Sequence, residues 1–270
     1  MKKIIVATDF SAEAENARQY AASAAAGQQY ELILFNLYNL SVHAMNARVS
    51  SEAIYELQMI NEKKLNEAAA ATAFSFGIKV TPHFATGDFY EEINRCIQQH
   101  NAEIVVMGMT GKSLELELLG NTTTSAIQRL KIPVLAIPFG VRYQGIKHIL
   151  FACDTVRGVH RNILEKVRDV AASFGAVVEV FHVKEKIEEL ITVQDQNEKI
   201  DEAMAGIGHY YKNIESKKVI EAIQQEVLNS KTDLLIMVPY KYGFWSSLTH
   251  RSKTRIMASG SNVPLLTISL

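Results

Sequence analysis

One segment in the first half of the chain has the residue types and spacing of an anion-binding site. It reads Met107-Gly108-Met109-Thr110-Gly111, then eight residues, then Gly120-Asn121-Thr122 at the start of a predicted helix. Glycines let the backbone approach a phosphate closely. The free N–H groups and the dipole of a helix N-terminus favour negative charge. The segment therefore predicts a phosphate site that includes Gly111, Gly120, Asn121 and Thr122.

Two other phosphate motifs are excluded. A Walker A loop needs a glycine five residues before Gly111, and Val106 stands there. A dinucleotide fingerprint follows the first strand of a sheet, whereas the first predicted strand ends in Thr8-Asp9-Phe10-Ser11 without a glycine.

The remaining reactive side chains form no set that can be read from the sequence. Cys96 and Cys153 are too few for a disulfide framework or a four-cysteine zinc site. The histidines, His83 and His100 among them, show no metal-ligand spacing with cysteines or acids, so no metal site is expected. No nucleophile, base and acid are arranged together, and no catalytic residue is assigned.

The elements that must position the phosphate segment occur twice. The repeated segments, in the same order in both halves, are Lys3–Asp9 with His148–Asp154, Leu34–Leu37 with Val180–Val183, Ala102–Met107 with Thr232–Met237, and Ile132–Ile137 with Val263–Ile268. A repeat of this length indicates two domains rather than a solenoid. We predict domains at 1–139 and 146–270, with the boundary in the glycine-containing stretch Phe139–Gly145.

Each half alternates strands and helices. In the first half, apolar runs predict buried strands at Ile4–Ala7, Leu32–Leu37, Val80–Ala85, Ile104–Met107 and Val134–Ile137. Helical patterns lie between them at Ala12–Ala26 after Ser11, at Ser51–Phe76 before Gly77, at Tyr90–Gln99 and at Thr123–Leu130. Right-handed crossovers then give an α/β fold of two tandem doubly wound domains, each with a mainly parallel five-stranded sheet covered by helices on both faces.

These residues resemble those of a known family. Val6-Ala7-Thr8-Asp9 and the Gly-x2-Gly-x8-Gly-Asn-Thr segment from Gly108 look like a tandem universal stress protein, with two family domains covering nearly the whole chain. The resemblance implies an adenine nucleotide alpha hydrolase-like fold. The family pattern is Gly-x2-Gly-x9-Gly followed by Ser or Thr, and its ATP-binding members hold the triphosphate there. This chain differs in its shorter spacer and in Asn121 after Gly120.

The resemblance assigns the first-half residues to parts of a bound ATP. The adenosine end would face Ala7, Thr8, Asp9 and Leu37, with Asp9 near a base or ribose edge or a metal ion. The ribose would lie along Met107 and Gly108. The phosphates would lie at Gly111, Gly120, Asn121 and Thr122.

The second half departs further from the family pattern. Val238 replaces the glycine, Pro239 removes a backbone donor, and Tyr240, Tyr242, Phe244 and Trp245 would crowd a triphosphate. We therefore expect ATP, with or without Mg, in the first domain only.

The expected function is that of a cytoplasmic, regulatory stress-response protein that binds ATP or a related adenine nucleotide and hydrolyses little or none of it. Two alternatives stay open. One is a protein-interaction or signalling module that needs no nucleotide. The other is a nucleotide-hydrolysing or adenylating enzyme, although the first-strand turn lacks the Ser-Gly-Gly loop of such enzymes.

The composition and the last strands bear on partners. A net charge of −1 disfavours nucleic-acid binding, and no apolar run is long enough for a membrane span. Val134–Ile137 and Leu265–Ile268 each end a domain. The resemblance implies that the two domains pair through these strands, and we expect the whole chain to form a homodimer.

Overall fold

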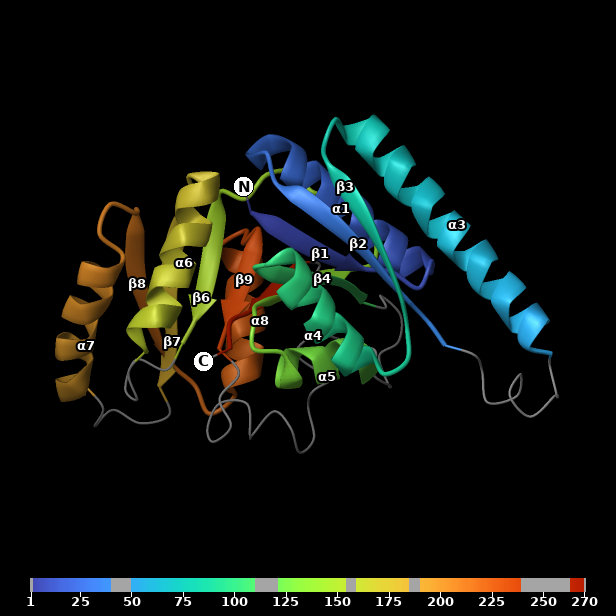
Figure 1. The fold of residues 1–270 in the computed structure, drawn as a ribbon. Coiled ribbons are helices and arrows are strands. Elements are labelled where there is room, and N and C mark those ends of the chain that lie inside the picture. The colour runs from blue at the N-terminus through green and yellow to red at the C-terminus, as the bar shows by residue number, and fades with distance from the viewer. Residues whose placement is uncertain are drawn as a thin grey trace. The chain divides into compact units, whose positions relative to one another are not determined.

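The computed structural model describes residues 2–39, 50–109, 121–153, 159–184, 190–238 and 263–269. It divides into two compact units, Met1–Gly108 and Met109–Leu270, which are called the first and second units. Both units are built from strands and helices (Figure 1). No helix in the described part of the chain has the length and apolar character needed to cross a bilayer.

The first unit is a parallel sheet with helices on both faces. Its elements are β1 (Lys3–Ala7), α1 (Ala12–Gln28), β2 (Glu31–Tyr38), α3 (Ser51–Phe76), β3 (Val80–Thr86), α4 (Phe89–His100) and β4 (Ile104–Met109). The strand order is β3-β2-β1-β4, and each of these neighbouring pairs is parallel. Helices α1 and α3 cover one face of the sheet, and α4 covers the other (Figure 1). The chain therefore moves outward from β1 to β3 and then crosses to the other side of β1.

The apolar runs explain the strands of this unit. Ile5, Val6 and Ile33 have no exposed surface, because helices cover both faces of the sheet. The predicted helix ends are confirmed at Ser11, whose hydroxyl accepts a hydrogen bond from the Ala14 N–H at 3.2 Å, and at Gly77, which ends α3 with φ 63°.

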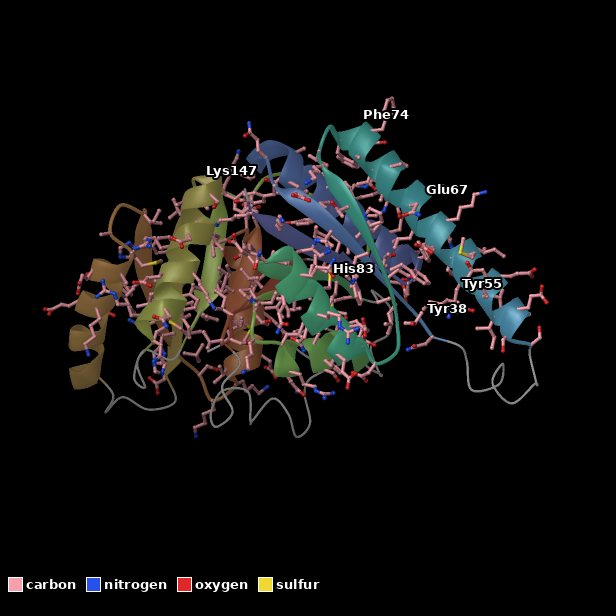
Figure 2. The ribbon with its side chains drawn as sticks, in the orientation of Figure 1. Tyr38, Tyr55, Glu67, Phe74, His83 and Lys147 are labelled. Atoms are coloured by element: carbon pink, nitrogen blue, oxygen red, sulfur yellow. The ribbon has the colours of Figure 1, made fainter. Side chains whose placement is uncertain are left out.

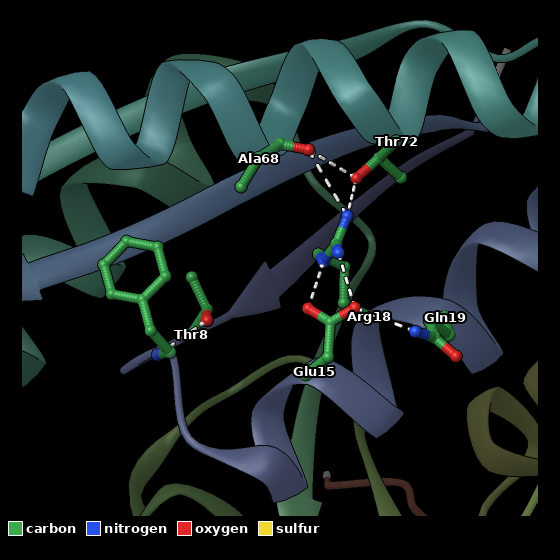
Figure 3. Close-up of polar contacts among 7 residues, drawn as sticks. Thr8, Glu15, Arg18, Gln19, Ala68 and Thr72 are labelled. Carbon is green, nitrogen blue, oxygen red and sulfur yellow. Dashed lines mark hydrogen bonds and ion pairs between the residues drawn. The ribbon is translucent and has the colours of Figure 1, made fainter.

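Arg18 joins the two helices on the same face (Figure 3). Its guanidinium forms an ion pair with Glu15 in α1 and donates to the Thr72 hydroxyl and the Ala68 carbonyl in α3. The Thr72 hydroxyl also donates to the Ala68 carbonyl at 2.6 Å. These contacts set the position of α3 relative to the start of α1.

The second unit contains the rest of the described elements. They are α5 (Asn121–Arg129), β5 (Val134–Pro138), β6 (His148–Ala152), α6 (Arg161–Phe174), β7 (Val177–Lys184), α7 (Leu190–Ala203), β8 (His209–Glu215), α8 (Val219–Asn229), β9 (Leu234–Met237) and β10 (Leu265–Thr267). The order is β5-β10-β9-β6-β7-β8. Its part β9-β6-β7-β8 is parallel and has the arrangement of β4-β1-β2-β3 in the first unit. The predicted α/β fold with a mainly parallel sheet is confirmed.

Strands β5 and β10 form an antiparallel pair within the second unit. Leu135 lies opposite Leu266, and the Thr267 hydroxyl donates to the Val134 carbonyl at 3.2 Å. Because of this pairing, β5 belongs to the compact second unit although the sequence repeat assigns it to the first half. The boundaries 1–139 and 146–270 remain predictions about domains.

Candidate functional site

The carboxyl edge of the first sheet gathers most of the predicted site residues. Because β1 lies between β2 and β4 and all three are parallel, their carboxyl ends share one edge. Six predicted residues lie along this edge: Ala7, Thr8, Asp9, Leu37, Met107 and Gly108. The strand order reverses between β1 and β4, and open α/β sheets bind ligands at such a reversal.

The turn after β1 has an unusual backbone that two side chains hold in place. Phe10 has φ 63°, which is rare for a bulky residue. The buried Thr8 hydroxyl accepts a hydrogen bond from the Phe10 N–H at 3.0 Å, and the Asp9 carboxylate accepts one from the Ser11 N–H at 2.9 Å. The Lys64 ammonium lies 4.2 Å from the centre of the Phe10 ring, a cation–π contact. The turn therefore presents the exposed Asp9 carboxylate at the edge in a fixed backbone conformation.

Asn36 is a buried polar residue near the end of β2 that the sequence analysis did not assign to the site. Its amide nitrogen donates to the Thr8 carbonyl at 2.7 Å, and only 4% of the residue is exposed. Its amide oxygen accepts no hydrogen bond from any residue that the structure describes. A buried acceptor without a donor is costly, so this oxygen marks a place for a donor from outside. The available clue was a polar residue within the apolar run Leu32–Leu37.

Gly108 is required by packing. A Cβ added to Gly108 would lie 2.5 Å from the carbonyl oxygen of Glu13 and 2.9 Å from the backbone nitrogen of Ala14. No side chain fits at that distance from two backbone atoms, so the first turn of α1 contacts the end of β4 directly. This requirement exists with or without a ribose beside Gly108.

The predicted phosphate residues are described only in part. Helix α5 begins at Asn121, two residues before the predicted range Thr123–Leu130, and Thr122 is exposed. Both residues belong to the second unit. Gly111 and Gly120 lie outside the described residues.

Comparison with known proteins identifies the family. The model of the universal stress protein family matches residues 1–138. The chain belongs to the universal stress protein family. A universal stress protein of Methanocaldococcus jannaschii is 28% identical over 140 residues, which span 50% of this chain and 81% of that relative.

Two solved structures share the fold of this universal stress protein over its whole length. One, a universal stress protein from Archaeoglobus fulgidus, has a TM-score of 0.77 and 20% identity, and covers 99% of this chain and 98% of its own. The other, a putative universal stress protein from Pseudomonas aeruginosa, has a TM-score of 0.62 and 15% identity, and covers 100% of this chain and 93% of its own.

The second unit of this universal stress protein contains a counterpart of the Thr8–Asn36 contact. The Cys153 N–H donates to the Phe181 carbonyl at 3.1 Å, as the Thr8 N–H does to Phe35 at 2.8 Å. His182, which is 4% exposed, places its Nδ1 atom 3.1 Å from the Cys153 carbonyl. Asp154 and the stretch 239–262, with its predicted aromatic crowding, lie outside the described residues.

A second cluster in the first unit was missed by the sequence analysis. His83 on β3 meets Cys96 and His100 on α4, and one potential ligand atom from each lies within 4.8 Å of the others. Burial lowers the pKa of both histidines and raises the pKa of the Cys96 thiol to about 12. The available clue was the four-residue separation of Cys96 and His100, which places both side chains on one face of a helix. The partner on β3 could not be read from spacing.

Proposed function

We propose that this universal stress protein is a regulatory stress-response protein that binds ATP or a related adenine nucleotide, with or without Mg, at the carboxyl edge of β1, β2 and β4. The observation that carries the proposal is the buried oxygen of Asn36, which accepts no hydrogen bond from the described residues and lies beside the turn where the strand order reverses.

The residues at this edge fit the adenosine part of such a ligand. The Asn36 oxygen can accept a hydrogen bond from a ligand N–H or O–H group. The exposed Asp9 carboxylate can accept hydrogen bonds from ribose hydroxyls or contribute to holding Mg²⁺. The fixed backbone of the Thr8–Ser11 turn reduces the cost of ordering these groups when a ligand binds.

We assign the phosphates to the segment from Gly111 to Thr122, as the family resemblance implies. The support is chemical, since glycines permit close backbone approach and α5 begins at Asn121, where free N–H groups favour an anion. Little or no hydrolysis is expected, because the sequence provides no candidate general base or arginine finger near this segment.

Calorimetric titration of Mg·ATP into the full chain tests the proposal. Wild type should bind one nucleotide, and Gly120→Val should lose binding because a branched side chain blocks the approach of phosphate. Gly27→Ala is the matched glycine control, because a Cβ there meets nothing within 4 Å, and it should bind like wild type. A phosphate-release assay on the same samples tests for turnover.

Titration of AMP beside ATP separates the two parts of the site. Weaker binding of AMP would support a phosphate contribution from the glycine segment. Failure of wild type to bind any adenine nucleotide at about millimolar concentration would overturn the proposal.

A protein-interaction module is the second candidate, because α3 exposes large apolar side chains. Tyr55 is 61% exposed, Ile60 is 62% exposed, and Phe74 is 92% exposed and projects from the helix (Figure 2). Exposed apolar side chains that lie together, as Tyr55 and Met59 do one turn apart on α3, favour a binding surface. Protein binding that is the same with and without ATP would favour this candidate.

We also propose that the two sequence repeats pair through their last strands and that the chain is a cytoplasmic homodimer. The antiparallel pairing of β5 with β10 supports the first part. Light scattering after size-exclusion chromatography tests the dimer, and a monomer across the accessible concentration range would contradict it.

A further inference from the structure

Three metal-ligating side chains converge between β3 and α4 of the first unit. His83 comes from the middle of β3 (Figure 2). Cys96 and His100 come from adjacent turns of α4. The Nδ1 atom of His83 lies 3.1 Å from the Nε2 atom of His100. The Cys96 sulfur lies within 4.8 Å of both ligand nitrogens.

The distance between the two histidine nitrogens is close to what a tetrahedral zinc ion requires. Zinc binds histidine nitrogen at about 2.0–2.1 Å and cysteine sulfur at about 2.3 Å, which separates two nitrogen ligands by roughly 3.3 Å and nitrogen from sulfur by roughly 3.6 Å. Adjustments of side-chain rotamers would therefore place all three atoms around one ion.

We propose that His83, Cys96 and His100 form a binding site for a zinc-class metal ion. Zinc binds both histidine nitrogen and cysteine thiolate, the two kinds of ligand present here. On binding, the Cys96 thiol releases its proton to solvent and the sulfur bonds to the metal. Three protein ligands leave a fourth position for water or an added ligand.

The surroundings hold the ligands in place. The His83 ring stacks on Phe35 with a centroid separation of 5.7 Å and an interplanar angle of 24°, and it meets the edge of the His100 ring at 5.2 Å. Phe35 is buried and also contacts Phe89 at the start of α4. Ligands that packing already orients lose less freedom when a metal binds.

Simpler explanations account for parts of the cluster only. A hydrogen bond between neutral imidazoles explains the 3.1 Å contact, and a buried cysteine often serves as a small apolar residue. Neither explanation requires the sulfur of the fully buried Cys96 to lie within 4.8 Å of a ring nitrogen of each histidine. A metal ion does require it.

Cobalt titration of the full chain, after treatment with a chelator, tests the proposal. Co²⁺ should bind at one equivalent and give the intense near-ultraviolet absorption of a thiolate–cobalt bond, and Zn²⁺ should displace it. Cys96→Ser and His83→Ala should each weaken binding by on the order of 100-fold or more, because loss of a direct ligand exceeds the cost of losing an outer-shell partner. Cys153→Ser and His160→Ala are the matched controls and should bind like wild type.

Folding is checked on each variant by thermal unfolding without metal. If Cys96→Ser fails to fold, the partly exposed His100→Ala variant carries the test. Absence of stoichiometric binding to wild type would overturn the proposal. Binding without the thiolate absorption, or binding that survives in folded Cys96→Ser or His100→Ala, would assign the metal to other groups and overturn it equally.

Discussion

The carboxyl edges of the two parallel strand sets have the same backbone contacts and different side chains. In the first unit, Asn36 contacts the Thr8 carbonyl, and in the second, His182 contacts the Cys153 carbonyl. The opposite, amino ends of the strands also correspond, because the Glu103 N–H donates to the Lys3 carbonyl at 3.0 Å and the Asp233 N–H donates to the His148 carbonyl at 2.9 Å. The two halves therefore share a scaffold, whereas the side chains that would meet a ligand have diverged.

The connection after the first strand of each half also differs. Four residues, 8–11, separate β1 from α1, whereas eight, 153–160, separate β6 from α6. The shorter connection brings the first turn of α1 against Gly108. The position that corresponds to Gly108 in the repeat is occupied by Val238, which is buried. We infer that the longer connection removes the need for a glycine.

Replacing Gly108 with valine, the residue at the corresponding position of the second half, should have the largest effect on stability. Gly108→Val should lower the free energy of unfolding by about 3 kcal/mol or more, because the added carbons overlap the backbone of Glu13 and Ala14. Chemical denaturation measures the change. Gly27→Ala should instead raise stability by up to about 1 kcal/mol, since α1 gains a better helix former in open space. Wild-type stability in Gly108→Val would show that α1 does not begin where the structure places it.

Replacing Asn36, whose side chain contacts the Thr8 carbonyl, should have an intermediate effect on stability. Asn36→Ala should cost about 2 kcal/mol, because the Thr8 carbonyl loses its donor and a small cavity forms. Asn36→His, the second-half residue, should cost less because an imidazole N–H can replace the amide donor. Both variants should weaken ATP binding if the Asn36 oxygen receives a ligand donor.

The control for Asn36 is a partly exposed asparagine. Asn61→Ala on α3 removes a comparable side chain that donates to the Leu57 carbonyl at 2.9 Å, and it should change stability by less than about 0.5 kcal/mol. Equal losses of stability in Asn36→Ala and Asn61→Ala would mean that burial of the Asn36 amide contributes nothing to stability.

The sequence predicts the scaffold well because local rules determine it. The apolar run Ile4–Ala7, the cap Ser11 and the stop Gly77 each depend on neighbouring residues, and the structure confirms all three. The hydrogen-bonding deficit of Asn36 depends on contacts between strands, so spacing along the chain does not reveal it. The left-handed Phe10 could not be expected either, because bulky residues rarely adopt that conformation. The metal cluster likewise needs His83 to be brought from β3 to α4 by the fold.

Each unit contains a buried glutamate, and the pKa values of the two are shifted in opposite directions. Burial acts to raise the pKa of Glu31, but hydrogen bonds from Lys79 and Thr81, together with the charges of Lys79 and Lys3, outweigh burial and lower it. In the second unit, burial and the charge of Glu226 raise the pKa of Glu179 despite a hydrogen bond from Tyr210 and the charge of Lys212. Hydrogen bonds and the Lys79 charge favour the ionised form of Glu31. Burial and the Glu226 charge disfavour the ionised form of Glu179, although the His148 Nε2 atom lies 3.6 Å from its carboxylate.

The smallest expected effects on stability follow from these two pKa shifts and have opposite signs. A raised folded pKa means that Glu179 stabilises the fold below its ordinary value of 4.5 and loses that contribution as pH rises through the folded pKa. Glu31, with a lowered pKa, stabilises the fold above 4.5 and loses its contribution as pH falls through the folded pKa. At neutral pH, Glu179→Gln should therefore raise stability, by about 1 kcal/mol, because the amide can still accept from Tyr210 without a buried charge.

Glu31→Gln should lower stability at neutral pH by no more than about 0.5 kcal/mol, because its partner Lys79 is 66% exposed and solvent screens the pair. Denaturation of both variants from about pH 2 to pH 8 measures these slopes. The free energy of unfolding of wild type minus that of Glu179→Gln should fall with rising pH. The same difference for Glu31→Gln should rise. If both differences changed with pH in the same direction, the contrast would be contradicted. Such a result would mean that Lys79 does not stabilise the Glu31 carboxylate, or that ionisation of the buried Glu179 has no cost.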